Sequence, residues 1–454
     1  MIRCLTETLL LHDFGLHVHL PEHRLCPTVP NRLNYLSWAH GILDSTLPLY
    51  EILEGSSNAR CRGRTEVRAL DIGTGASAIY PILGCAVDPS WSFTATDIDD
   101  ESLRWASKIV REPLNNLSFS MHGHRKKKHL HLKDRIRLLH RKVEDPLIPP
   151  RSDIGVPHAR LLYHLTMCNP PFYSSEEEMR ASYELKEQEP SAVCHGTENE
   201  MITEGGEVNF VKRMVEESMG LWESVILYSS MLGKLSSLRL LVEHLRERGV
   251  GNYAIGELIQ GQTRRWVLGW SHTPYRIAGG MSSCKSLALA RLLPSATMRS
   301  MSFDLSSDEE REEVLIERLK SILVGLGSSE FIQTQGGGGD GKSDHLLEVK
   351  MMSESWTRSA RRARTRRQKQ GEEEEEEAAG GSNHQEPLLC VRFSLERFMN
   401  GDDDDEERVG SSSRATKERR RLISQWIYGR DRIKFESLTG HVFQRFEDSL
   451  RGKR

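Results

Sequence analysis

The chain has 454 residues, of which 37% are hydrophobic and 28% are charged, and its formal net charge is −3. This length leaves room for about two or three domains. The sequence contains no run of about eighteen apolar residues, so a transmembrane helix is not expected. Its eight cysteines include no C-x-x-C pair, which argues against a zinc site or a disulfide framework and favours reduced thiols.

Residues 1–66 predict a mostly helical N-terminal segment. The short apolar stretch at the start contains Glu7 and is followed at once by His12 and Asp13, which favours an amphipathic helix over a signal peptide. An extended stretch at 27–30 and a helix from about Asn31 to Leu43 should follow.

Residues 67–75 predict a short strand that enters a glycine turn, with a helix beginning directly afterwards. Gly73 and Gly75 allow the backbone to turn tightly and to approach a ligand closely. The order strand, glycine turn and helix is that of a Rossmann-like half. The spacing D-x-G-x-G, beginning at Asp71, differs from the dinucleotide fingerprint G-x-G-x-x-G, so NAD is not the expected ligand.

An acidic residue at the end of the next strand would bind ribose hydroxyls. Residues 91–96 predict that strand, and Asp97 ends it. Residues 101–110 then carry helical spacing of apolar side chains. A doubly wound sheet binds ligands beyond the carboxyl ends of its strands, so these features predict a ligand site at one sheet edge.

The third motif is Asn169-Pro170-Pro171-Phe172, which follows a buried strand predicted over 161–168. Consecutive prolines lack donor N–H groups and must end that strand in a rigid corner. The carbonyl oxygens of Asn169 and Pro170 can accept the two N–H groups of an exocyclic amine. The Phe172 ring can stack on the base, a contact worth about 1–3 kcal/mol. The plainer interpretation is a structural Asn turn at a strand end.

The rest of the region 67–275 should complete this sheet. Two polar loops are predicted, over 118–134 and 173–207, and such loops at a ligand edge commonly grip substrate. A buried strand over 225–231, a helix over 235–248 and a last strand over 266–270 follow.

Residues 276–333 and 345–454 predict a small α+β accessory region that binds RNA. It is interrupted by low-complexity linkers that should be disordered, over 334–344, 370–386 and 400–416. Strands are expected over 298–305, 346–351, 388–393 and 423–428. One helix should run from Ser307 through Leu323, and a final helix has one apolar face, formed by Leu438, Val442, Phe443 and Phe446.

Charge is unevenly distributed along the chain. Acidic residues gather in Glu372–Glu377 and Asp402–Glu407, whereas basic residues gather in His122–Lys128, Arg358–Lys369 and Lys417–Arg421. Basic clusters can line phosphates and make binding salt-dependent. Solvated loops or a nuclear-import signal are the alternative interpretation.

Together these motifs resemble the methyltransferase-like protein 16 family, whose bacterial relative is the ribosomal RNA adenine methyltransferase RlmF. The matching stretches are 13–16, 27–35, 70–84, 95–100, 167–172, 204–213, 231–234 and 261–266. The resemblance implies a Rossmann-like class I α/β methyltransferase with S-adenosylmethionine as methyl donor. It further implies N(6)-methyladenine in structured RNA as product, U6 small nuclear RNA with an ACAGA-type sequence as substrate, and the nucleus as location.

The resemblance also implies residue roles. Asp71, Gly73, Thr74 and Gly75 would contact the methionine part of the cofactor, and Asp97 would contact its ribose. Arg32 and Asn169 would also lie near the cofactor. Without the resemblance, the alternative for Arg32 is a salt bridge on a helix surface. The target adenine would be held by Asn169, Pro170, Pro171 and Phe172, and in-line transfer needs no strong general base. No metal is expected.

Candidate phosphate contacts are Lys212, Arg213, Arg264 and Arg265, of which Arg265 matches the family pattern better than Arg264. The family also has a loop that can occupy the cofactor site. Residues 141–144 are its nearest match, and whether they inhibit stays open, as do protein partners and oligomeric state.

Three other functions stay open at this point. The same corner serves protein glutamine-amide methyltransferases, because a glutamine amide is also a flat nitrogen, and DNA adenine methyltransferases that flip a base. A catalytically silent RNA chaperone is the third, and the intact Asn169 and Asp71 argue against it.

Overall fold

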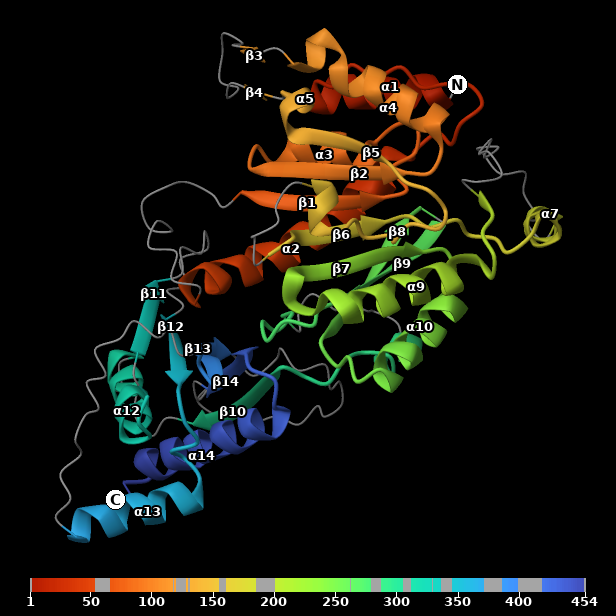
Figure 1. The fold of residues 1–454 in the computed structure, drawn as a ribbon. Coiled ribbons are helices and arrows are strands. Elements are labelled where there is room, and N and C mark those ends of the chain that lie inside the picture. The colour runs from red at the N-terminus through yellow and green to blue at the C-terminus, as the bar shows by residue number, and fades with distance from the viewer. Residues whose placement is uncertain are drawn as a thin grey trace, which may run out of the picture. The chain divides into compact units, whose positions relative to one another are not determined.

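The computed structural model describes residues 2–53, 66–116, 118–119, 128–129, 131–154, 161–184, 201–261, 263–278, 287–304, 312–328, 330–335, 345–370, 386–398 and 419–452. The chain forms two compact units, shown in Figure 1. The first comprises Met1–Thr273 and Gly280–Ser295, and the second comprises Pro274–Gly279 and Ala296–Arg454. The N-terminal segment and the sheet region therefore belong to the same unit, apart from Pro274 and Tyr275.

The first unit is built on a seven-stranded sheet with the order β5-β2-β1-β6-β7-β9-β8. Strands β5, β2, β1, β6 and β7 run parallel, whereas β9 is antiparallel to both β7 and β8. The strands are β1 Val67–Ile72, β2 Trp91–Asp97, β5 Ile136–His140, β6 Tyr163–Cys168, β7 Val225–Leu232, β8 Tyr253–Gln260 and β9 Thr263–Trp270. This arrangement confirms the predicted Rossmann-like α/β fold.

The register of β1 explains where the ligand site forms. Ile72 at the end of β1 is paired with Thr96 of β2 on one side and with Cys168 of β6 on the other. The chain leaves all three strands at the same edge, because they are parallel. The glycine turn, Asp97 and the Asn169 corner therefore emerge side by side.

Helices cover both faces of this sheet. The helices of this unit are α1 Ile2–Phe14, α2 Val29–Leu53, α3 Ile79–Val87, α4 Asp100–Arg111, α5 Leu132–Arg135, α6 Arg151–Ile154, α7 Glu176–Glu184, α9 Gly206–Leu221, α10 Leu235–Glu247 and α11 Leu287–Ala290. A Cβ at Gly269 of β9 would touch Trp38 of α2, while the neighbours Leu268 and Trp270 pack with side chains of α9 and α10. Successive strand residues face opposite sides, so α2 covers one face, and α9 and α10 cover the other.

Several predicted boundaries in this unit were wrong. The helix expected from Asn31 to Leu43 is part of the longer α2, which continues through Pro48. The loop expected over 118–134 includes the short pair β3 Ser118–Phe119 and β4 Lys128–His129, followed by α5. The loop expected over 173–207 includes α7 and the start of α9, and its residues 185–200 lie outside the described part.

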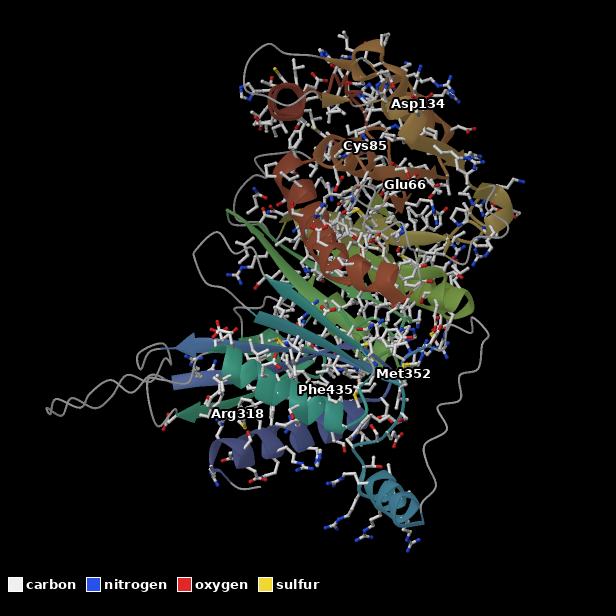
Figure 2. The ribbon with its side chains drawn as sticks, turned by 90° about the vertical axis from the view of Figure 1, so that its left-hand side faces the viewer. Glu66, Cys85, Asp134, Arg318, Met352 and Phe435 are labelled. Atoms are coloured by element: carbon white, nitrogen blue, oxygen red, sulfur yellow. The ribbon has the colours of Figure 1, made fainter. Side chains whose placement is uncertain are left out.

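The second unit contains a five-stranded sheet with the order β10-β14-β13-β12-β11, antiparallel throughout. Its strands are β10 Met298–Asp304, β11 Glu330–Gln335, β12 His345–Met351, β13 Leu389–Phe398 and β14 Arg419–Tyr428, and its helices are α12 Glu312–Gly325, α13 Arg358–Gln370 and α14 Arg432–Leu450. The apolar face predicted for α14 is confirmed, because its four side chains are buried. Figure 2 labels Phe435 in this core, where its ring stacks on Trp426 at 5.6 Å.

Two basic clusters form a helix and a strand, unlike the solvated loops of the alternative interpretation. Residues 358–369 form most of α13, and Arg419–Arg421 form the first part of β14, where Arg420 is only 4% exposed. Of the predicted linkers, residues 334 and 335 belong to β11, Gln370 ends α13 and Glu386 is described, whereas the remaining linker residues lie outside the described part. In the cluster 122–128, only Lys128 is described.

Among the described residues, no helix is long and apolar enough to span a bilayer. In the same residues, no group of His, Cys, Asp and Glu side chains is arranged to hold a metal ion.

Candidate cofactor and target-base site

A cavity of about 550 Å³ opens where β1, β2 and β6 end. Most of the residues predicted for a ligand site line it: Arg32, Gly73, Thr74, Gly75, Asp97, Asn169, Pro170, Pro171 and Arg213. Asp71 does not line it but lies directly beneath, only 1% exposed. Segments that are far apart in sequence therefore meet at one site.

The glycine turn is held by backbone contacts to β2. The N–H groups of Gly73 and Thr74 donate to the Thr96 carbonyl at 3.0 and 2.9 Å. The Gly75 N–H donates to Asp97 Oδ2 at 2.8 Å. Gly73 and Gly75 adopt φ values of 72° and 63°, a left-handed backbone conformation that residues with a Cβ rarely adopt. The D-x-G-x-G spacing thus serves the turn itself.

Asp97 contributes to this turn as well as to the cavity wall. Its second oxygen, Oδ1, accepts the Asp99 N–H at 2.9 Å. Burial raises the pKa of the Asp97 carboxyl, and the hydrogen bonds from Asp99 and Gly75 partly offset that rise. A carboxylate has about four lone-pair sites, so further acceptor capacity remains for a ligand hydroxyl.

Asp71 is a buried carboxyl with one satisfied oxygen. Its Oδ2 accepts the Thr74 hydroxyl at 2.7 Å, whereas its buried Oδ1 has no hydrogen-bond partner. Burial raises the pKa of the Asp71 carboxyl to about 7, although the Thr74 hydrogen bond lowers it. A buried acceptor left unpaired costs free energy unless a ligand or water completes it.

Arg32 reaches the same region from α2. Its Nη1 donates to Asn169 Oδ1 at 2.8 Å and to the Tyr80 hydroxyl at 3.0 Å, while its buried Nε has no hydrogen-bond partner. The side chain thus points into the site, and the alternative of a helix-surface salt bridge is wrong. Arg32 Nε and Asp71 Oδ1 are therefore two buried atoms, on groups of opposite charge, that lack a hydrogen-bond partner.

The Asn-Pro-Pro-Phe corner is fixed by its neighbours. The N–H of Tyr173 donates to the Met201 carbonyl at 3.0 Å, and the Thr203 N–H donates to the Tyr173 carbonyl at 2.9 Å. Phe172 lies beside the cavity, with its ring against Gly233, where a Cβ would come within 2.9 Å of the ring. The corner is therefore held in place by its neighbours, as a stacking site for a planar group requires.

The four predicted phosphate contacts have different surroundings. The Arg265 guanidinium lies 5.8 Å from the centre of the Phe172 ring, whereas the side chain of Arg264 is 60% exposed and reaches Glu257 at 3.5 Å. The two arginines are adjacent on a strand and so face opposite sides. Lys212 is half-buried on α9. Of the four, Arg265 lies near Phe172 and Arg213 lines the cavity with the proline corner.

Arg213 has a structural task. It donates to the Asp145 carbonyl at 2.5 Å, to the Val143 carbonyl at 3.4 Å and to Glu217 at 3.0 Å. These bonds use much of the donor capacity of the guanidinium group, so Arg213 anchors the loop 141–148 against α9. Its role as a phosphate contact stays a prediction.

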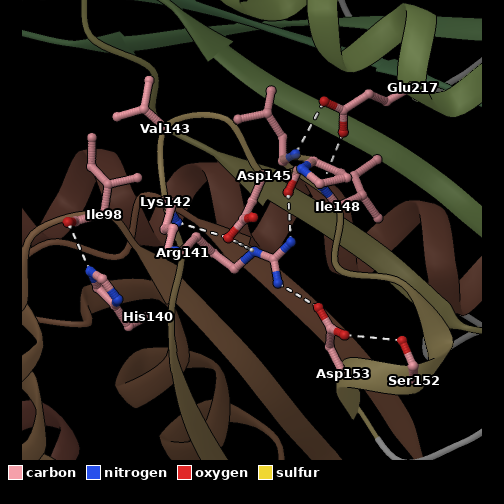
Figure 3. A network of polar contacts seen from close by, with 12 residues as sticks. Ile98, His140, Arg141, Lys142, Val143, Asp145, Ile148, Ser152, Asp153 and Glu217 are labelled. Carbon is pink, nitrogen blue, oxygen red and sulfur yellow. Dashed lines mark hydrogen bonds and ion pairs between the residues drawn. The ribbon is translucent and has the colours of Figure 1, made fainter.

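The loop 141–148 forms one wall of the cavity. Figure 3 shows the polar contacts that hold this loop. Arg141 donates to Asp153 Oδ2 at 2.5 Å, and Glu217 accepts the N–H groups of Leu147 and Ile148, each at 3.1 Å. The stretch 141–144 that resembles an inhibitory loop thus does lie at the cavity. Whether it inhibits stays a prediction.

Sequence analysis missed four contributors to the site. Tyr80 touches Arg32, Arg24 pairs with Asp99 and with Glu101 at 2.7 Å, and Glu207 and Glu217 hold two loops. Each acts through a partner that is distant in sequence. The stretch 204–207 resembles the family, but no role in the site was predicted for it.

Similar known proteins identify the family of this chain. A family profile described as RNA methyltransferase matches residues 1–274. A U6 small nuclear RNA (adenine-(43)-N(6))-methyltransferase of Schizosaccharomyces pombe is 31% identical over 361 residues, which cover 80% of each chain. The RNA N(6)-adenosine-methyltransferase METTL16 of Homo sapiens is 38% identical over 272 residues, 60% of this chain and 42% of that one.

The chain thus spans less than half of the human relative. A crystal structure of the hMettl16 catalytic domain in complex with the MAT2A 3'UTR hairpin 6 is 36% identical, covers 60% of this chain and 81% of that one, and gives a TM-score of 0.46. From the family profile and the fission yeast relative, the chain belongs to this family of RNA methyltransferases.

Proposed function

We propose that the protein transfers a methyl group from S-adenosylmethionine to the N(6) amine of an adenine in RNA, with U6 small nuclear RNA as its substrate. The observation that carries this proposal is the placement of Asn169 and its proline corner beside the unsatisfied Arg32 Nε and Asp71 Oδ1. A zwitterionic amino acid group and a planar amine could bind next to each other there.

The residues present fit the cofactor. Arg32 would hold the methionine carboxylate, Asp71 its ammonium group, and Asp97 the ribose hydroxyls. When bound, S-adenosylmethionine supplies an electrophilic methyl group on a sulfonium. The chain's own contribution is to place that ligand in the cavity, between the glycine turn and the loop 141–148.

The target amine would be held by acceptors. Asn169 Oδ1 already accepts one bond from Arg32, which fixes the carboxamide with its oxygen toward the site. Its second lone pair and the Pro170 carbonyl can accept the two N–H groups of adenine. Phe172 would stack on the base, and Arg265 beside it would meet the backbone of the RNA. Orientation and desolvation then provide most of the acceleration.

Family membership favours RNA over the glutamine amide or DNA that the corner alone leaves open. The choice of U6 RNA rests on what the names of the fission yeast relative and of a Dictyostelium discoideum relative say of those proteins. A nuclear location follows from that substrate, and imaging of the tagged chain would test it.

The test is to incubate the purified chain with labelled S-adenosylmethionine and, separately, total RNA, DNA or protein. Label should enter RNA and increase when U6 RNA is added. Label in DNA or on protein glutamine, with RNA unlabelled, would overturn the proposal. The Asn169→Ala variant serves as the control for label carried by a contaminating enzyme.

A further inference from the structure

Helix α9 carries two glutamates that each accept two backbone N–H groups, from two different walls of the site. Glu207 accepts the N–H groups of Gly233 at 2.7 Å and Lys234 at 3.1 Å. Glu217 accepts those of Leu147 and Ile148, each at 3.1 Å (Figure 3). Ten helical positions separate the two glutamates, which corresponds to about 15 Å along the helix axis.

Glu207 holds the wall on the target-base side. Its side chain lies in the interior, 2% exposed, and burial raises the pKa of its carboxyl, partly offset by bonds from Ser237 and the turn. The turn it binds leads from β7 into α10, whose N-cap residue Lys234 makes no side-chain cap of its own. Glu207 therefore supplies acceptors for orphan donors at the start of α10.

The same turn fixes the place of Phe172. A Cβ at Gly233 would lie 2.9 Å from Phe172 Cδ1, closer than side chains tolerate, so the ring rests directly on the glycine. Any shift of the turn must move the ring. The carboxylate of Glu207 thus acts on the Phe172 ring through Gly233.

Glu217 holds the wall on the cofactor side. Leu147, whose N–H it binds, lines the cavity together with residues 141–143. Arg213 reinforces the contact, because it pairs with Glu217 at 3.0 Å and also binds the carbonyls of Val143 and Asp145. The loop is therefore tied to α9 at residues 143, 145, 147 and 148.

We propose that Glu207 and Glu217 are positioning residues with separate tasks: Glu207 sets the target-base wall through Gly233 and Phe172, and Glu217 sets the cofactor wall through the loop 141–148. The proposal rests on the proposed function and deepens it. Neither side chain touches the reacting atoms. A carboxylate is required because it presents acceptors alone, whereas an amide turns an NH₂ donor toward one of the two backbone donors.

The experiment compares Glu207→Gln and Glu217→Gln in the full chain. Two quantities are measured for each: the Kd for S-adenosylhomocysteine by calorimetry, and kcat and KM for U6 RNA at saturating cofactor. Loss of a hydrogen bond to a charged group corresponds to roughly a tenfold effect or more. We expect Glu207→Gln to lower kcat/KM for RNA by about tenfold and to change the S-adenosylhomocysteine Kd less than about twofold.

Glu217→Gln should do the opposite. Its Kd for S-adenosylhomocysteine should rise about tenfold, while kcat and KM for RNA at saturating cofactor stay within about twofold. The matched control is Glu216→Gln, at the neighbouring position on α9, where the carboxylate pairs with His244 and Arg248 instead of a wall of the site. This control should leave both quantities unchanged.

A second variant protects the test against misfolding of Glu207→Gln. Gly233→Ala keeps the glutamate, but its Cβ would lie 2.9 Å from the Phe172 ring and 3.3 Å from Glu207 Oε2. It therefore disturbs both partners on this wall and should lower kcat/KM for RNA with cofactor affinity intact. The proposal is overturned if both glutamine variants change the same quantity alike, or if neither differs from the control. Cofactor affinity can be measured without turnover, so a failure of the RNA reaction in the wild-type chain would be recognised separately.

Discussion

Arg32 Nη1 donates to Asn169 Oδ1 across 2.8 Å, although the two residues are 137 positions apart in the sequence. One belongs to α2 in the N-terminal segment and the other follows β6. This bond joins a candidate cofactor ligand to the candidate amine acceptor. It also fixes which end of the Asn169 carboxamide faces the site, which is the property that amine recognition needs.

Asn169→Ala should abolish methyl transfer while cofactor and RNA binding persist. The change removes an acceptor that matters most in the transition state, and the loss of a comparable preorganised group costs about 2.7–4 kcal/mol, or about 10²–10³ in kcat. Single-turnover rates and binding isotherms on the same preparations check this. Near-normal turnover by the variant would show that the amine is held elsewhere.

Asp97→Ala should weaken binding of S-adenosylhomocysteine by about 1.5–3 kcal/mol, because ribose hydroxyls lose a charged acceptor. The same carboxylate accepts the N–H groups of Gly75 and Asp99, so the turn loses support as well. Calorimetry measures the affinity, and adenosine alone separates the two effects, since it retains the ribose contact but not the methionine end. Unchanged affinity for both ligands would contradict the assignment.

Cofactor affinity should depend on pH through Asp71. Burial raises the pKa of this carboxyl from 3.8 to about 7 in the protein without ligand, and a ligand ammonium favours its ionised form. The S-adenosylhomocysteine Kd should therefore fall as pH rises through about 7. Asp71→Asn should remove this dependence. The ligand's own ammonium loses its proton only at higher pH, and that loss weakens binding to both proteins.

The same shift gives a stability change of opposite sense. Between about pH 4 and 7 the unfolded chain ionises Asp71 while the folded chain keeps it protonated. This contribution to stability is full below about pH 4 and is lost as pH rises toward 7. Denaturant titrations of wild type and Asp71→Asn without cofactor should show the wild type losing stability relative to the variant over that range. A parallel pair of pH profiles would refute the assignment.

The basic helix α13 should bind phosphates of the RNA. Arg358, Arg362 and Arg366 are exposed and spaced by four, so they share one face. Changing all three to Gln should weaken RNA binding and flatten its log–log salt dependence by roughly 0.7–0.9 for each phosphate that the variant no longer neutralises. The triple Lys variant keeps the charges and should keep most of the slope. Identical slopes for wild type and the Gln variant would show that these three arginines of α13 do not contact RNA phosphates.

The sequence alone predicted the parts of the site that lie in local motifs. The glycine turn, Asp97 and the corner each follow a short strand whose buried residues are mostly apolar, and the parallel sheet brings them together. By contrast, β5 and β8 were not predicted. Only the first residue of β5 is fully buried, and Gly256 and Glu257 interrupt the apolar pattern of β8.

Tertiary support could not be predicted for a different reason. The hydrogen bonds of Glu207 with Gly233 and of Glu217 with Leu147 join segments 26 and 70 positions apart, and no local pattern encodes such pairs. Arg213 illustrates the same limit. Its charge suggested a phosphate contact, whereas its donors reach carbonyls of a loop that precedes it by 68 positions or more.

The most direct test of the proposed activity is the chemical identity of the product. U6 RNA is incubated with the full chain and S-adenosylmethionine carrying a deuterated methyl group, digested to nucleosides, and analysed by mass spectrometry. We expect deuterated N(6)-methyladenosine, absent with Asn169→Ala and absent when the adenine of the ACAGA-type sequence is replaced by guanine. A methyl group on another nucleoside, or the same yield from Asn169→Ala, would contradict the proposed activity.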